Sequence, residues 1–471
     1  MFRSLHIWRL CFLICTSLVF CCGSMHPTNA QESIPSNPFG VVEGFWLPQD
    51  VCDLQVGWER IIFDWSQHQP EGPDDWHTLN VDDRWLANAR ECGREVVAIV
   101  KHTPDWATDG ITGAGVPKGL YLPLNDPNNL WARFLRRAAE YYAPRGVSRF
   151  ILWNEPDITR ETYGFEFEGT LEDYFQLLKV GYLALKQGNP QSEILLAGMT
   201  YWHDVNEGRR LYLDRLLERI VSDPDASLNN YYFDIASLHI YFRTETVYDI
   251  VRDIREVLDR YGLASKRIWI NEMNAAPTDD PLWPVVRPQY QLDLDQQSAF
   301  LVQATALGLA AGAERIAVYK FYDWNLPPGG EAFGLLRADA SRRPAFDAWA
   351  MIISQFSGVT EAALAETNRL NVVRLNRRDS QQMLVMWTQM DQPTSIWVQA
   401  TANESSLVNQ YGEHMLLTPE SGGYRISLEG ARCNRVDGCA IGGRPLILIQ
   451  PFGESAVKEI ASPSDIDLVF P

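Results

Sequence analysis

The sequence predicts an α/β protein, a (β/α)8 TIM barrel followed by an antiparallel, β-sandwich-like C-terminal domain. The first observation behind this prediction is that short apolar runs alternate with helical patterns from about Phe39 to Phe356. The second is that eight such units in roughly 320 residues match a parallel barrel with modest insertions. The third is that the helical patterns stop after Ser357, where strand patterns follow one another.

The eight predicted barrel strands are short apolar runs separated by longer segments. They are Phe39–Trp46, Arg60–Trp65, Val96–Val100, Phe150–Asn154, Ile194–Ala197, Phe233–Tyr241, Arg267–Glu272 and Arg315–Phe321. Helical patterns between them include Trp131–Tyr142, Leu171–Lys186, Arg209–Val221, Val247–Tyr261 and Gln296–Ala311. This alternation favours a parallel sheet with helices outside it. A doubly wound open sheet is the alternative, although no glycine-rich phosphate-binding run follows the first predicted strand.

A barrel over residues 39–357 and a β-rich domain over residues 358–455 follow from these patterns. The strand patterns of the second domain are Asn371–Arg378, Met383–Thr388, Thr394–Gln399, Tyr424–Glu429 and Pro445–Gln450. Polar turns connect them and no long helical pattern intervenes, which favours antiparallel pairing. Residues 456–471 are predicted as a C-terminal tail.

Residues 1–30 have the pattern of a secretory signal peptide, and residues 31–38 form a linker. Two arginines precede an apolar run from Leu10 to Cys22, which is shorter than the roughly 20 residues that span a bilayer. Cleavage is expected after Thr28-Asn29-Ala30. A lipid anchor on Cys21 or the cysteine after it is the alternative. We therefore expect a secreted, periplasmic or cell-surface protein with no integral membrane span once the signal is removed.

Cleavage would remove four of the eight cysteines. Cys433 and Cys439 lie six residues apart in a loop of Asn, Asp and Gly, and in an exported protein this favours a disulfide between them. Cys52 and Cys92 form either a second disulfide or two buried free thiols. Because no Cys or His group has zinc-site spacing, we expect no metal and no cofactor.

Composition and charge exclude several classes of protein. With 46% hydrophobic and 21% charged residues, the chain is an ordinary globular protein rather than a disordered one. The formal net charge of −19, from 41 Lys+Arg against 60 Asp+Glu, together with the lack of a basic stripe, argues against nucleic acid as a partner. The oligomeric state is left open.

Two of the predicted barrel strands end in an Asn-Glu pair. The fourth ends in Trp153-Asn154-Glu155-Pro156 and the seventh in Asn271-Glu272-Met273-Asn274. Catalytic residues of such barrels project from the C-terminal ends of the strands. By the two-residue period of a strand, Ile268, Ile270 and Glu272 share one face, so Glu272 is predicted to end an apolar row that points into the barrel.

This arrangement resembles the clan A retaining glycoside hydrolases, the 4/7 superfamily, over about Phe39–Trp349. Within that clan the chain is most similar to the family 39 group of β-xylosidases and α-L-iduronidases. Runs that carry the similarity are Phe63-Asp64-Trp65, Thr103-Pro104-Asp105-Trp106-Ala107, Ser237-Leu238-His239-Ile240-Tyr241, Phe333-Gly334-Leu335-Leu336 and Arg343-Pro344-Ala345. The resemblance implies a carbohydrate substrate and hydrolysis of O-glycosidic bonds. The substrate-binding residues of family 39 are not clearly matched, so the sugar is not predicted.

The resemblance also implies a role for each glutamate. Glu272 would be the nucleophile, kept charged by a hydrogen bond from Tyr241, and Glu155 would be the acid/base. A retaining enzyme holds the two carboxyl groups about 5–5.5 Å apart and forms a covalent glycosyl-enzyme intermediate. Asn154 would bind the sugar 2-hydroxyl beside the reacting carbon.

Four more residues are candidate substrate contacts. His239 shares a strand face with Tyr241, and the clan often has a tryptophan floor at the place of Trp324 and an arginine near the nucleophile at the place of Arg60. His102 follows the third strand. An ordinary packing or surface role is the alternative for each of the four.

Two other functions fit the same residues. One is a catalytically silent barrel that binds carbohydrate, and the other is a transglycosidase, in which a sugar replaces water in the same mechanism. The presence of both Glu155 and Glu272 favours an enzyme over a silent barrel.

Overall fold

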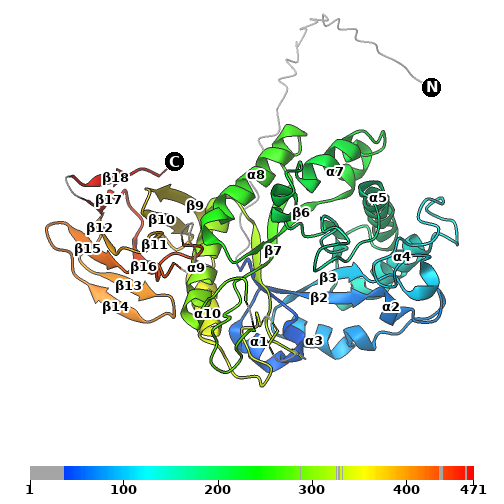
Figure 1. Cartoon of the computed structure of the whole chain (residues 1–471), viewed down its shortest axis with the longest axis horizontal. Helices are drawn as coiled ribbons and strands as arrows, with labels where there is room; N and C mark the ends of the chain where they lie inside the picture. The colour runs from blue at the N-terminus through cyan, green and yellow to red at the C-terminus, as the bar shows by residue number, and fades with distance from the viewer. Residues whose placement is uncertain are drawn as a thin grey trace, which may run out of the picture. The chain divides into compact units, whose positions relative to one another are not determined.

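The computed structural model describes residues 37–286, 288–324, 326, 329–330, 332–433, 439–461 and 464–470. Within these residues, eight parallel strands pair in chain order and close into a barrel, which confirms the predicted fold (Figure 1). The strands are β1 (Phe39–Val42), β2 (Trp58–Asp64), β3 (Glu95–Lys101), β4 (Arg149–Leu152), β5 (Glu193–Leu196), β6 (Ile235–Tyr241), β7 (Arg267–Asn274) and β8 (Arg315–Val318). The predicted signal peptide lies outside the described residues.

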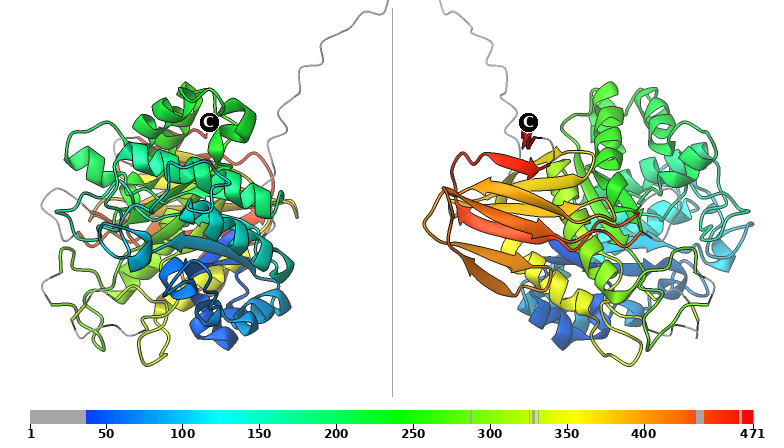
Figure 2. Two further views of the ribbon diagram at one scale, coloured as in Figure 1. Left: turned by 90° about the vertical axis from the view of Figure 1, so that its right-hand side faces the viewer. Right: turned by 60° about the vertical axis from the view of Figure 1, so that its left-hand side comes forward.

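The helices lie around the outside of the barrel (Figure 2). They are α1 (Pro48–Leu54), α2 (Trp65–His68), α3 (Asp83–Glu91), α4 (Leu130–Tyr142), α5 (Leu171–Gly188), α6 (Trp202–Asn206), α7 (Tyr212–Val221), α8 (Val247–Arg260), α9 (Leu294–Ala310) and α10 (Pro344–Phe356). Capping boxes begin α5 at Thr170 and α9 at Asp293, where they satisfy backbone N–H groups of the first turn. None of the helices among the described residues is long and apolar enough to cross a membrane.

The N-terminal end of the barrel is filled and sealed. Trp58 and Trp269 pack against each other inside it. Around them, the first residues of several strands form a ring of ion pairs, in which Arg149 pairs with Glu95 and Glu193, and Arg315 pairs with Glu95. A packed barrel interior is not a pore, so a substrate can reach the barrel centre from the C-terminal end alone.

The C-terminal residues form two antiparallel sheets that face each other across an apolar core. One sheet has six strands in the order β14-β13-β16-β11-β10-β9, and the other has four in the order β15-β12-β17-β18. The bounds are β9 (Val359–Glu366), β10 (Leu370–Arg377), β11 (Gln381–Thr388), β12 (Thr394–Gln399), β13 (Ser405–Asn409), β14 (His414–Leu417), β15 (Gly423–Leu428), β16 (Leu446–Pro451), β17 (Val457–Ile460) and β18 (Ile466–Leu468). Leu384 of the first sheet and Ile396 of the second belong to the same buried cluster, so the sandwich prediction is confirmed.

This β domain has more strands than the sequence predicted, since neither β9 nor β13 was among the predicted strands. The segment predicted as a C-terminal tail contributes β17 and β18, which extend the four-stranded sheet from β12. The strand β14 was not predicted because its residues are exposed on both faces and show no alternation of apolar and polar side chains. Pairing with β13, rather than burial of one face, places β14 in the sheet.

Two disulfides are formed among the described residues. Cys433 is bonded to Cys439, as predicted. Cys52 is bonded to Cys92, which decides between the two alternatives for that pair. This second bond forms because Cys52 lies in α1 and Cys92 immediately follows α3, and the two Cα atoms are 5.6 Å apart.

Candidate active site

Two glutamates and a histidine meet at the C-terminal end of the barrel. Glu272 lies in β7, Glu155 follows β4 and His239 lies in β6. One carboxylate oxygen of each glutamate and a ring nitrogen of His239 all lie within 4.8 Å of one another. His239 Nδ1 is 2.5 Å from Glu155 Oε1 and 3.4 Å from Glu272 Oε2. The sequence motifs thus meet in space, with the imidazole between the two carboxylates.

A β-bulge in β7 determines that the Glu272 side chain points into the barrel. Leu238 of β6 pairs with Ile270, but the next residue, His239, pairs with Glu272, so Asn271 is an extra residue on β7. Such a bulge shifts the alternation of side chains by one position. The residue of β7 that fills the barrel before the bulge is Trp269.

The predicted inward row is therefore wrong for two of its three members. The site of Gly308 in α9 lies against the Ile270 side chain, so Ile270 points at the surrounding helices, and Ile268 shares its face. Glu272 points into the barrel because the bulge changes the strand's alternation after Ile270.

Glu155 lies just after β4, in a backbone turn with unusual φ values. The predicted strand Phe150–Asn154 ends at Leu152, and Trp153 and Glu155 have φ values of 77° and 41°. These left-handed conformations are unfavourable for residues with a Cβ and are typical of functional sites. The Glu155 N–H donates to the carbonyl of Gly198 after β5, which holds the turn in place.

Gly198 also makes room for the histidine. A Cβ atom added at Gly198 would lie 1.9 Å from His239 Nε2, so any larger residue would push the imidazole away from the glutamates. His239 is buried, and Nε2 has no hydrogen-bond partner among the described residues. Burial alone would lower the pKa of His239, but the neighbouring charges of Glu272 and Glu155 raise it.

The surroundings of Glu272 keep its carboxylate ionised. Arg60 forms an ion pair with one oxygen, and the Tyr241 hydroxyl donates to the other. Burial alone would raise the pKa of Glu272, but Arg60, His239 and the hydrogen bond from Tyr241 outweigh burial and hold the pKa below its ordinary value. Two further nitrogens of Arg60 are buried without a hydrogen-bond partner in the described part of the chain.

Asn154 and His102 lie at neighbouring strand ends. Asn154 is buried, and its Oδ1 has no hydrogen-bond partner within the described residues, so the amide is able to bind a ligand hydroxyl. His102 follows β3 with a φ of 69°, and its Nδ1 is 2.8 Å from Asp64 Oδ2. His102 is thus held by Asp64 while part of its ring stays exposed.

Trp324 does not end strand eight, because β8 stops at Val318. Trp324 comes six residues later, is 51% exposed, and stacks on Trp46 with ring centroids 4.6 Å apart. The residue that directly follows β8 is Tyr319, whose ring is 6.0 Å from that of Tyr241.

Tyr319 is a site residue that the sequence reasoning missed. Its pKa is raised, first by burial and then by the charge of Glu272. Asn274 Nδ2 fixes this wall by donating to the carbonyls of Tyr319 and Phe333, at 2.6 and 2.7 Å. The signal that could have found Tyr319 was its position at the end of the apolar run Arg315–Val318.

Comparisons with known proteins bear on the fold. No family model matches the chain, and no curated protein matches it in sequence. A family 39 glycoside hydrolase from Bacteroides cellulosilyticus WH2 matches 88% of this chain and 81% of its own, with a TM-score of 0.67 and 17% identity.

Two further structures show the same likeness. A monomeric β-xylosidase from Caulobacter crescentus CB15 has a TM-score of 0.58 and 13% identity, over 89% of this chain and 97% of its own. A family 30 endoxylanase from Clostridium papyrosolvens C71 has a TM-score of 0.56 and 11% identity, over the same shares. The chain therefore has the fold of these solved glycoside hydrolases, and the fold of a family 39 enzyme is the one that its motifs predicted.

Proposed function

We propose that this protein is a retaining glycoside hydrolase with Glu272 as nucleophile and Glu155 as acid/base. The observation that carries the proposal is that one carboxylate oxygen of each glutamate lies within 4.8 Å of one of the other at the C-terminal end of the barrel. Retaining enzymes hold their carboxyl groups about 5–5.5 Å apart, whereas inverting enzymes need about 6.5–9.5 Å to admit a water. The solved structures with the same fold are themselves described as glycoside hydrolases, which supports a carbohydrate substrate.

In the first half of the reaction, ionised Glu272 attacks the anomeric carbon and the bond to the leaving oxygen breaks. The ion pair with Arg60 and the hydrogen bond from Tyr241 keep Glu272 charged and fix its position. Glu155 gives its proton to the leaving oxygen as the bond breaks. The product of this half is a glycosyl ester of Glu272, with the sugar 2-hydroxyl placed to bond the amide of Asn154.

In the second half, Glu155 takes a proton from a water that attacks the anomeric carbon, and the ester bond to Glu272 breaks. The two inversions leave the configuration of the sugar unchanged. His239 is a positioning residue in both halves, since its Nδ1 contacts Glu155 Oε1 at 2.5 Å. When Glu155 is ionised, an N–H at Nδ1 donates to it and stabilises the charge.

We also propose that the protein is exported. The two disulfides among the described residues support this, because disulfides persist in oxidising compartments. The apolar N-terminal segment supplies the signal.

A panel of aryl glycosides that vary in sugar and anomer tests the enzymatic proposal directly. We expect release of the phenol from at least one member, with retention of configuration in the sugar product observed by NMR. Transfer of the sugar to an added alcohol in preference to water would identify a transglycosidase of the same mechanism. If no member is cleaved, the proposal of a glycosidase is wrong and a silent binding barrel becomes the better account.

Replacing Arg60 by glutamine should shift the acid limb of the profile of kcat/KM against pH to higher pH. Arg60 lowers the pKa of Glu272, and Glu272 acts only when ionised, so losing the cation raises the pH at which activity is lost. An adjacent cation lowers a carboxyl pKa by about one to three units, and the limb should move by a similar amount.

The matched control is Arg94→Gln. Arg94 forms a buried ion pair with Glu59, also in β2, at an Nε–Oε1 distance of 3.0 Å. This variant should lower stability without moving the acid limb. A limb that stays in place in Arg60→Gln would show that Arg60 does not control the charge of Glu272.

A further inference from the structure

The β domain is bonded to the barrel beside the strand that carries His239 and Tyr241. Just after β6, the Thr244 N–H donates to the carbonyl of Ala440 at 2.8 Å, and the Thr244 hydroxyl donates to Gln303 in α9. The Gln303 side chain in turn donates to the carbonyl of Gly443 at 2.8 Å and accepts from the N–H of Gly442. All three hydrogen bonds of the Gln303 side chain are buried. Together with the bond between Thr244 and Ala440, they hold this part of residues 440–443 against the barrel.

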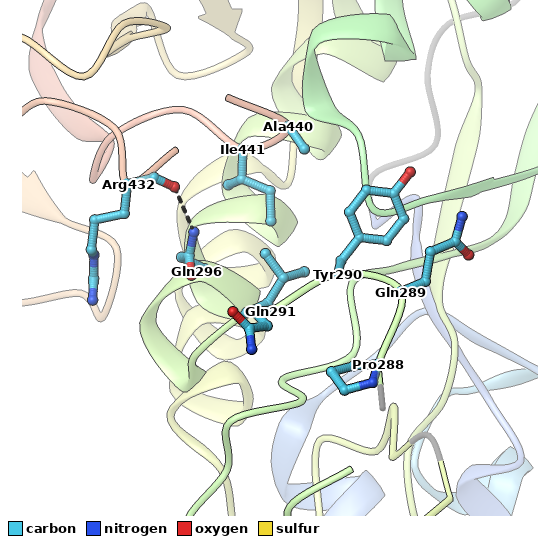
Figure 3. Close-up of a pocket in the computed structure, with 9 residues that line it drawn as sticks. Pro288, Gln289, Tyr290, Gln291, Gln296, Arg432, Ala440 and Ile441 are labelled. Atoms are coloured by element: carbon cyan, nitrogen blue, oxygen red, sulfur yellow. Dashed lines mark hydrogen bonds between the residues drawn. The ribbon is translucent and has the colours of Figure 1, made fainter. Parts of the chain in front are cut away.

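A cavity of about 210 Å³ lies at this junction (Figure 3). Its barrel wall is the segment that runs from Pro288 to Gln296, and its β-domain wall is formed by Arg432, Ala440 and Ile441. At about 30 Å³ per water, the volume corresponds to about seven waters. The cavity is therefore large enough for a polar group much bigger than a single solvent molecule.

The lining combines an aromatic ring with side-chain amides. Tyr290, Gln289, Gln291 and Gln296 all line the cavity. A glutamine amide carries both a donor and an acceptor, and the Gln296 oxygen already accepts from the Asp293 N–H. Gln296 is 6% exposed and reaches across the junction to donate to the carbonyl of Arg432 at 3.1 Å. Amides and an aromatic ring suit the hydroxyls and C–H face of a sugar.

The cavity carries little net charge. The guanidinium of Arg432 pairs with Asp293 and with Asp295, and Asp295 also pairs with Arg444. Since these charges are paired with one another, they do not select an ionic ligand. The lining thus fits an uncharged sugar unit better than an acidic one.

A row of aromatic rings leads from the cavity to the residue that bonds Glu272. The Tyr290 ring stacks on Phe242 with centroids 4.9 Å apart, and Phe242 lies 6.3 Å from Tyr241. The Tyr241 hydroxyl donates to Glu272. The Tyr290 ring is therefore two ring contacts away from the residue that bonds Glu272.

We propose that this cavity is a sugar subsite that barrel and β domain build together, and that it binds a neutral unit of the substrate chain away from the reacting bond. The inference rests on the proposed function and makes the substrate an oligosaccharide or polysaccharide. It also gives the β domain a part in substrate binding.

The test compares kcat/KM for unmodified oligosaccharides of increasing length, built from the sugar that the aryl panel identifies. Two variants perturb the cavity: Ala440→Phe fills it and Gln291→Ala removes an amide. We expect wild-type kcat/KM to rise when at least one sugar unit is added. Gln291→Ala should reduce that gain about fivefold, the size expected for one lost hydrogen bond, and Ala440→Phe should reduce it at least as much because the new ring occupies the cavity. Gln191→Ala, an exposed glutamine just before β5 at the opposite end of the barrel, is the control and should keep the full gain.

Equilibrium binding separates this inference from the proposed function. Oligosaccharides of xylose, glucose, mannose and galactose are titrated into wild type and Ala440→Phe, and thermal unfolding verifies that each variant is folded. If Ala440→Phe is misfolded, Gln291→Ala decides the outcome.

Binding to wild type that is weaker in the cavity variant supports the subsite even if no glycoside is cleaved. Cleavage with the same gain per sugar unit in wild type and variants overturns the subsite alone, and a wild type that neither cleaves nor binds any of these sugars overturns both.

Discussion

Replacing Glu272 by glutamine should lower kcat on every substrate by at least about 10⁴-fold, the scale seen when a nucleophile is removed from an enzyme. Glutamine has nearly the same shape, and its single side-chain oxygen can still accept a hydrogen bond from either Arg60 or Tyr241. What it loses is the negative charge that attacks the anomeric carbon. Initial rates on the best aryl glycoside measure the loss.

Glu59→Gln is the matched control for this variant. Glu59 is a fully buried carboxylate that pairs with an arginine, as Glu272 does, but its partner is Arg94 and it lies outside the site. We expect Glu59→Gln to keep kcat within about twofold of wild type, because an ion pair outside the site acts on stability rather than on the chemical step. A Glu272→Gln enzyme that retains wild-type kcat would show that another group is the nucleophile.

Replacing Glu155 by alanine should have an effect that depends on the leaving group. Alkyl glycosides need a proton on the leaving oxygen, so their kcat/KM should fall by about 10²–10⁴-fold, the usual contribution of general acid catalysis. The leaving group of a dinitrophenyl glycoside, dinitrophenolate, departs without a proton. The kcat/KM of this substrate should therefore change far less. A plot of log kcat/KM against leaving-group pKa measures this difference as a steeper slope in the variant.

The control for the acid is Glu161→Ala. Glu161 is an exposed carboxylate in the same connection between β4 and α5, so its loss should leave the slope unchanged. An equal loss of kcat/KM across all leaving groups in Glu155→Ala would contradict the role of Glu155 as acid.

The barrel and its two carboxylates were predictable because their signals are local. Apolar runs set the strands, and the Asn-Glu pairs ending at Glu155 and Glu272 follow two of those runs. The bulge at Asn271 was not predictable, because the run Arg267–Glu272 contains no glycine or proline that would mark an interruption of the strand. It is the pairing of His239 with Glu272, a contact between strands, that reveals the extra residue.

Errors of a few residues in the predicted strand ends changed one side-chain assignment and one strand boundary. Strand β8 ends at Val318 rather than Phe321, so Tyr319 lies where Trp324 was expected. Similarly, the predicted first strand ends at Val42, because Glu43 has a φ of 59° and a 3₁₀ turn follows over Gly44–Trp46. Propensity locates strands but not their last residues, and site residues lie at these ends.

The cavity at the domain junction had no signal in the sequence at all. Its two walls are more than 130 residues apart, as the bond between Gln296 and Arg432 shows. The sequence predicted a β-rich domain after the barrel, but only the folded chain shows that Ala440 and Ile441 lie against the connection that precedes α9.

A covalent bond between Glu272 and the substrate is the central claim, and one experiment measures it. A 2-deoxy-2-fluoro glycoside with a good leaving group slows both steps, because fluorine disfavours the oxocarbenium-like transition state, while the leaving group keeps the first step faster than the second. Mass spectrometry of the treated, digested protein should then show one fluorosugar on the peptide containing Glu272 and none on the peptide containing Glu155. Turnover of the parent glycoside without any label, or a label on a different carboxylate, would contradict the account.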